Sequence, residues 1–208
     1  MSEKSEIVPH AEALERLQEG NRRFVADVRS VASFTSQAQR ESLVAGQRPF
    51  AIILSCSDSR APSELLFDCG LGELFVVRVA GNVVAPSILG SVEFAAATFG
   101  SELVVVMGHS RCGAIAATVD AVRTGGQAMS ESVGDIVARI KPAVTELVHA
   151  DVDGDRLLGH AIRANVRAAT NHLRHGSRLL EDRIAAGKLR VVGAEYSLET
   201  GQVDFFDL

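Results

Sequence analysis

Several features are scarce in this 208-residue sequence: cysteine, proline, positive charge and long apolar runs. Lysine and arginine number 21 against 26 acidic residues, and the net charge of −5 argues against binding to nucleic acid. No apolar run approaches the ~20 residues of a membrane-spanning helix, so we expect no membrane partner. Three cysteines are too few for a disulfide framework and suit metal ligands, nucleophiles or core residues.

The start of the sequence, MSEKSEIVPH, is polar and lacks the apolar segment of a secretory signal. We therefore expect a cytoplasmic protein. Internal repeats, low-complexity tracts and linker-like stretches are also absent. Because the apolar content of 47% is typical of globular proteins and the chain is short for two domains, we predict a single domain over residues 1–208.

Strand and helix patterns alternate along the chain. Runs of strand character occupy 49–55, 74–80, 102–108 and 189–198, and a short one follows the turn at 199–201. Helical patterns occupy 10–27, 35–46, 86–100, 112–123 and 130–187, the last with breaks at Gly154 and Gly176. The alternation predicts an α/β fold with a mainly parallel central sheet, flanked by helices. We expect about four parallel strands and an antiparallel edge strand.

Within this domain, the same patterns predict three regions. Residues 1–46 would form an N-terminal helical arm, 47–125 an α/β core, and 126–208 a helical half with the final strands.

Two stretches of similar shape carry the potential chemistry: AIILSCSDSR at 51–60 and VVVMGHSRCG at 104–113. Cys56 follows the first strand, His109 follows the third, and Cys112 stands at the start of a helix. Ligands of open parallel sheets bind at the carboxyl ends of the strands, so these side chains converge if the two strands are neighbours. Two thiolates and an imidazole suit zinc and leave one tetrahedral position for water, a carboxylate or substrate. The residues alone also allow core cysteines or a redox or nucleophilic cysteine.

The sequence CSDSR at 56–60, together with GHSRCG at 108–113, resembles the paired motif of the β-class carbonic anhydrases. The likeness extends from the helical arm through GELFVVRVAGN to the ending VVGAEYSLETGQVDF. It implies that Cys56, His109 and Cys112 hold one Zn²⁺ per subunit. It also implies reversible hydration of carbon dioxide to bicarbonate and a proton, in which a metal-bound hydroxide attacks the carbon of CO₂.

The resemblance implies roles for further residues. Asp58, paired with Arg60 beside the metal, would orient the hydroxide in open sites and become the fourth zinc ligand in closed ones. Binding of CO₂ or bicarbonate would involve Gln47, Phe75, Ala80 and Gly113.

The resemblance also concerns partners and regulation. The family is built from dimers in which the arm lies across the neighbour, which implies a homodimer or a dimer of dimers. Some bacterial members bind bicarbonate at a regulatory site that needs a tryptophan just before the first zinc cysteine. This chain has no tryptophan, and Ile53 stands at the matching place, so we predict no such site.

Three other readings remain open at this point. A hydrolase of carbon disulfide or carbonyl sulfide shares the fold and the ligand set. A noncatalytic protein would use Cys56, Asp58, His109 and Cys112 to close a structural zinc site. A thiol enzyme without metal would keep its function after chelation.

Overall fold

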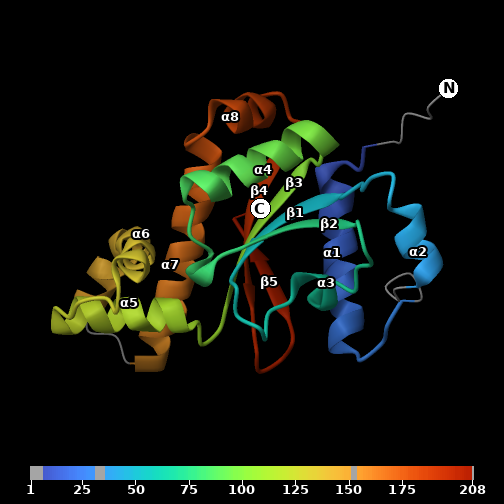
Figure 1. The fold of residues 1–208 in the computed structure, drawn as a ribbon. Coiled ribbons are helices and arrows are strands. Elements are labelled where there is room, and N and C mark those ends of the chain that lie inside the picture. The colour runs from blue at the N-terminus through green and yellow to red at the C-terminus, as the bar shows by residue number, and fades with distance from the viewer. Residues whose placement is uncertain (1–6, 31–35, 151–153, 208) are drawn as a thin grey trace.

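A five-stranded sheet forms the centre of the computed structural model, which describes residues 7–30, 36–150 and 154–207. The strand order is β2-β1-β3-β4-β5 (Figure 1). The first four strands are parallel, and the last runs antiparallel to its neighbour at one edge. The predicted fold class is confirmed. The strands are β1 (Ala51–Ser55), β2 (Leu74–Arg78), β3 (Leu103–His109), β4 (Arg190–Tyr196) and β5 (Val203–Phe206).

The helices and strands agree with the elements predicted from the sequence, with three main differences. The predicted helix at 35–46 is shorter, since α2 ends at Ser42. Helix α3 has no counterpart in the prediction, because four residues are too few to show a helical period. The strand predicted at 74–80 ends at Arg78, and a 3₁₀ turn, η2 (Ala80–Asn82), follows. The α-helices of the described residues are α1 (His10–Val25), α2 (Gln37–Ser42), α3 (Ser63–Leu66), α4 (Pro86–Phe99), α5 (Gly113–Thr124), α6 (Glu131–His149), α7 (Gly154–His175) and α8 (Arg178–Ala185).

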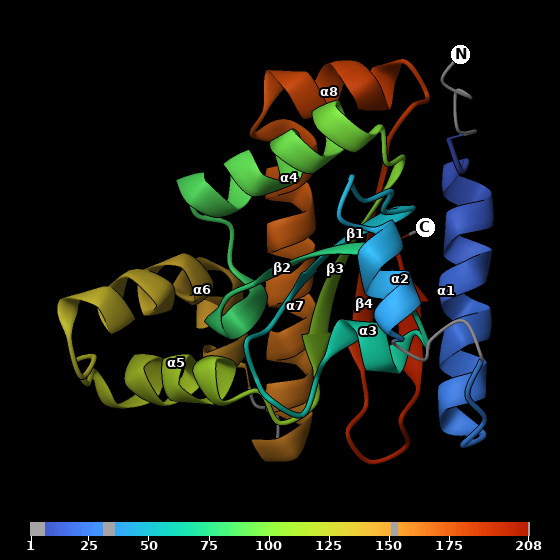
Figure 2. The same ribbon diagram turned by 45° about the vertical axis from the view of Figure 1, so that its right-hand side comes forward.

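Helices cover both faces of the sheet (Figure 2). Side chains of β1 alternate between the faces: Ile53 packs in one cluster with Leu17 of α1. Ile52 and Leu54 pack in the opposite cluster with Val92 of α4 and with residues of α7 and α8. Because both faces are covered, every residue of β1 and β3 is buried, which explains their nearly unbroken apolar sequences.

The N-terminal helix α1 is attached to its own subunit. Asn21 is buried, and its Nδ2 donates to the carbonyls of Leu66 (3.2 Å) and Gly201 (3.0 Å). Its Oδ1 accepts from the backbone N–H of Val203 at 2.9 Å. Ala13, Leu14 and Leu17 of α1 also pack in the core of the same subunit.

Helices α5 and α6 lie side by side beyond the carboxyl ends of the central strands (Figures 1 and 2). Together with α7 they form a third apolar cluster, which includes Cys56 and Cys112. The potential metal ligands therefore sit where the sheet meets this helical group. Among the described residues, none of the helices combines the length and the apolar character that a membrane crossing requires.

Candidate metal centre

The two strands that carry the potential ligands are neighbours in the sheet. Strands β1 and β3 pair in parallel, with Ser55 opposite Met107. Cys56 therefore leaves β1 beside the end of β3, where His109 is the last residue. Cys112 follows after a short loop and is the N-cap residue of α5. The two strands are neighbours, as the predicted convergence required. The three side chains lie at the point where the strand order reverses.

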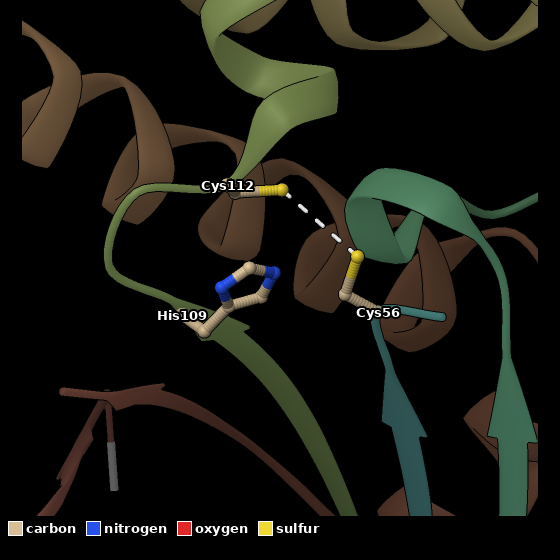
Figure 3. A group of neighbouring side chains, drawn as sticks. All are labelled: Cys56, His109 and Cys112. Carbon is tan, nitrogen blue, oxygen red and sulfur yellow. Dashed lines mark hydrogen bonds between the residues drawn. The ribbon is translucent and has the colours of Figure 1, made fainter. Parts of the chain in front are cut away.

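The three ligand atoms form a compact, buried group (Figure 3). They lie within 4.8 Å of one another, and the two sulfur atoms are 4.0 Å apart. Two Zn–S bonds of the usual length at a tetrahedral angle would separate the sulfurs by about 3.8 Å. The spacing of the side chains therefore fits a tetrahedral zinc ion.

The imidazole of His109 is oriented as a metal ligand should be. Its Nδ1 lies 2.9 Å from the carbonyl oxygen of Ser110, an acceptor, so Nδ1 carries the proton and Nε2 the lone pair. Nε2 is buried and has no hydrogen-bond partner among the described residues. A buried acceptor without a donor is costly, and a cation at this position would satisfy it.

The two thiols shift each other's pKa in opposite directions. The hydrogen bond from Cys112 lowers the pKa of Cys56, and the interaction with His109 and the backbone N–H of Gly81 also favour this thiolate. The same pairing, with burial, raises the pKa of Cys112. Burial lowers the pKa of His109, but the Cys56 thiolate outweighs it and raises the pKa overall. A divalent cation would supply the charge that lets both thiols ionise and leaves the imidazole neutral.

Asp58 and Arg60 form a bidentate pair beside these ligands. Arg60 Nε donates to Asp58 Oδ1 at 2.9 Å, and Nη2 donates to Oδ2 at 2.8 Å. Oδ2 lies 3.9 Å from His109 Nε2. The guanidinium holds the pKa of the Asp58 carboxyl well below its usual range. Asp58 is thus an ionised acceptor that Arg60 fixes at the edge of the metal centre.

Comparison with known proteins agrees with this geometry. The sequence model of the family described as carbonic anhydrase matches residues 51–203, and solved β-carbonic anhydrases share the fold. The chain belongs to the β-class carbonic anhydrases.

Among relatives in this family, carbonic anhydrase 2 of Mycobacterium tuberculosis is 38% identical over 190 residues, which cover 91% of this chain and 89% of the relative. The carbonic anhydrase of Mycolicibacterium smegmatis is 37% identical over 192 residues, with coverage of 92% and 91%. The structure of the β-carbonic anhydrase CcaA superposes with a TM-score of 0.75 at 25% identity and covers 93% of this chain and 87% of its own. A tetrameric β-carbonic anhydrase of Sordaria macrospora shares the fold with a TM-score of 0.71 at 23% identity, over 81% of this chain and 86% of its own.

Two residues that the family resemblance assigned to substrate lie elsewhere in this subunit. Phe75 pairs with Ile52, four residues before Cys56, which is roughly 13 Å along a strand. Gln47 precedes β1 altogether and lines a separate pocket with Phe99. A single subunit therefore does not bring Gln47 or Phe75 to its own metal centre, because Gln47 lies before β1 and Phe75 lies near the amino end of β2.

The other two assigned residues lie close to the ligands. Ala80 begins η2, next to Gly81, whose N–H donates to Cys56 Sγ at 3.4 Å. Gly113 follows Cys112 directly, and a Cβ at this position would meet no atom within 4 Å. The space beside the first turn of α5 is therefore open.

The structure adds contacts that sequence reasoning missed. Arg78 donates from Nε to the carbonyl of Cys56 (3.1 Å) and from Nη2 to that of Asp58 (2.7 Å), so it supports the loop that carries both. The sequence offered one signal for this contact, because Arg78 is a basic residue at the end of a strand, as Cys56 is next to the end of another. Asn165 donates to the carbonyl of Gly81 at 2.8 Å. It lies in α7, far along the chain, where no spacing pattern connects it with the ligands.

Proposed function

We propose that this β-class carbonic anhydrase catalyses the zinc-dependent, reversible hydration of CO₂ to bicarbonate and a proton. Cys56, His109 and Cys112 would hold one zinc ion per subunit. The observation that carries the proposal is the Nε2 atom of His109, which has no hydrogen-bond partner among the described residues and is buried in a compact group with two sulfur atoms. The relatives named carbonic anhydrase support the choice of reaction.

The roles of the surrounding residues follow from their contacts. When bound, zinc lowers the pKa of a water molecule so that a nucleophile is available near neutral pH. Asp58 can only accept hydrogen bonds, so it would orient an O–H group of the nucleophile beside His109. Arg60 keeps both carboxylate oxygens engaged and thereby keeps Asp58 from becoming a ligand itself.

Ala80 and Gly113 are proposed to bound the space that CO₂ occupies. Both are small, and the position of Gly113 at the first turn of α5 leaves its backbone N–H without an intrahelical acceptor. Such N–H groups favour anions, so this end of α5 would stabilise the charge that develops on the oxygens of bicarbonate.

The decisive experiment is stopped-flow CO₂ hydration by zinc-loaded protein from mildly acidic to alkaline pH. We expect activity that rises with pH, since two thiolates make zinc less electrophilic than neutral ligands would. The variant Cys112→Ser should lose zinc and activity, whereas Cys69→Ser, the third cysteine, should keep both. Zinc-loaded protein without activity at any pH would refute the proposal.

We also propose that the protein is a homodimer or a dimer of dimers. Strand β2 is one edge of the sheet, and Phe75, Phe94 and Phe99 cluster beside it with ring centroids 5.8–6.3 Å apart. Phe94 is 54% exposed. Burial of this edge against a second subunit would cover the rings, and would give Gln47 and Phe75 a role at the neighbour's metal centre.

A cytoplasmic location is part of the same proposal. The three cysteines are free thiols, and two of them belong to the buried ligand group. A reducing compartment keeps such thiols available to a metal, which supports this location.

A further inference from the structure

The thiolate of Cys56 receives a hydrogen bond from a backbone group of η2. The N–H of Gly81 lies 3.4 Å from Cys56 Sγ, and Cys56 is only 5% exposed. A donor to a ligating sulfur draws charge from it, and so determines how strongly the sulfur donates to a metal. The position of the Gly81 N–H therefore affects how strongly the three ligands together would bind a metal.

The direction of a glycine N–H varies with its backbone conformation unless a contact restrains that conformation. Gly81 adopts φ +70°, a conformation that glycine tolerates, but glycine also has many alternatives of similar energy. A side chain cannot restrain it, because a Cβ would lie 2.9 Å from Ile140 Cδ1 and 3.2 Å from Ala114 Cβ. The restraint has to come from a partner of the Gly81 backbone.

Asn165 supplies that restraint from the opposite side of the turn. Its side chain is 2% exposed, and its Nδ2 donates to the carbonyl oxygen of Gly81 at 2.8 Å. The carbonyl and the N–H of Gly81 flank the same Cα, so fixing one limits rotation of the other. Helix α7, which carries Asn165, is packed against the sheet through Val166 and Ala169.

We propose that Asn165 is a positioning residue of the metal centre. It holds the Gly81 carbonyl, and thereby keeps the Gly81 N–H directed at the Cys56 thiolate. The inference rests on the proposed zinc site, and it adds a residue of the helical half to the determinants of metal affinity. Asn165 touches neither metal nor substrate and acts only through Gly81.

The test compares Asn165→Leu and Asn165→Ala with Thr170→Val in the full-length protein. Leucine has the branched shape of asparagine without a donor. Alanine is the second variant because it adds no bulk, in case the larger leucine prevents folding. Thr170 is a matched control because it is buried on the same helix, and its hydroxyl has no hydrogen-bond partner among the described residues. Zinc affinity is measured by competition with a chelator, and the thiolate-to-metal charge-transfer band is recorded with Co²⁺.

We expect zinc affinity to fall by about 10–100-fold in the Asn165 variants, as for other residues that hold a metal ligand in place. The charge-transfer band should move to longer wavelength, since a sulfur without its donor is more easily oxidised. Thr170→Val should change neither. Folded Asn165 variants with wild-type affinity and an unshifted band would overturn the inference alone. Wild-type protein that binds neither metal through sulfur would overturn the proposed function and this inference together.

Discussion

At the scale of single residues, Arg60 controls Asp58 through three hydrogen bonds. The backbone N–H of Arg60 also donates to Asp58 Oδ1, at 2.9 Å, in addition to the two guanidinium contacts. Asp58 Oδ2 remains within 3.9 Å of His109 Nε2, so a released carboxylate is close enough to compete for the metal. We therefore propose that the Arg60 side chain keeps Asp58 a hydrogen-bond acceptor and prevents it from becoming a fourth zinc ligand.

The variant Arg60→Gln tests this role. Without the guanidinium, Asp58 is free to approach the ligand group, and we expect kcat/KM for CO₂ hydration to fall by about 10–100-fold. Zinc content should remain one per subunit, because all three ligands are intact. Stopped-flow kinetics and metal analysis check the two outcomes. Arg139→Gln, which breaks a bidentate pair with Asp135 on α6, is the matched control and should retain activity.

Glu199 makes a second residue-level contribution, at the loop between His109 and Cys112. It accepts from Arg111 Nε at 2.6 Å and from Ser110 Oγ at 2.7 Å. Arg111, and then Ser110, lower the pKa of Glu199 to about 2. A carboxyl with a depressed pKa stabilises the folded state above its unfolded pKa of about 4.3, and loses that contribution as the pH falls towards 2.

We therefore expect Glu199→Gln to lower the melting temperature slightly at neutral pH. The effect is small because Arg111 and Glu199 are 68% and 47% exposed, and solvent screens the pair. The difference from wild type should shrink progressively below about pH 4.3. Thermal unfolding of both proteins at a series of pH values measures it. A difference that stays constant as the pH falls would contradict the ionic origin of the effect.

At the scale of elements, the close approach of α1 to the loop after α3 is made possible by one glycine. A Cβ on Gly20 would lie 1.9 Å from the carbonyl oxygen of Phe67, which is backbone and cannot move aside like a side chain. Asn21, the next residue, binds Leu66 and the β4–β5 turn. The arm is thus fitted to its own subunit at this point.

Gly20→Ala should destabilise the protein by about 1–3 kcal/mol, the usual cost of overpacking. Gly159→Ala is the matched control: it lies inside α7, and its Cβ would meet no atom within 4 Å. That substitution should stabilise the protein by about 0.5–1 kcal/mol, because alanine favours a helix over glycine. Urea unfolding measures both, and equal effects of the two substitutions would show that α1 does not dock as described.

The elements also show what the sequence could predict. Long apolar runs and helical periods gave the strands and the longer helices, because burial on a sheet or a helix face repeats along the chain. Cys56 and His109 could be predicted to converge because each follows or ends a strand of a parallel sheet, and ligands bind at the carboxyl ends of such strands. Helix α3 and the contact between Asn165 and Gly81 escaped prediction, since neither depends on a repeating pattern. Gln47 could be matched to the family by its distance from Cys56 in sequence, but that distance does not predict its place in the subunit, where it lines a separate pocket.

At the scale of the whole molecule, the two edges of the sheet differ. At the β5 edge, Arg163 contacts both Glu195 and Asp204, and Arg167 binds Asp207, so charged side chains lie along it. At the β2 edge lies the aromatic group that includes Phe94. Charges on an edge strand oppose pairing with another chain, whereas exposed aromatic rings favour burial in an interface. Assembly through the β2 side is therefore the arrangement that the surface favours.

Replacing Phe94 by glutamate tests this assembly. A carboxylate in place of a ring that is 54% exposed would be buried without a partner in the proposed dimer, so we expect Phe94→Glu to shift the protein towards monomers. Sedimentation or light scattering measures the mass, and circular dichroism checks that the subunit stays folded. Met129→Glu, at a side chain that is 93% exposed between α5 and α6, should leave the mass unchanged.

If Phe94→Glu keeps the wild-type mass, the interface lies elsewhere. If it yields folded monomers, CO₂ hydration should fall with the mass, because the monomer would lose the contribution that we propose Gln47 and Phe75 make at the neighbour's metal centre.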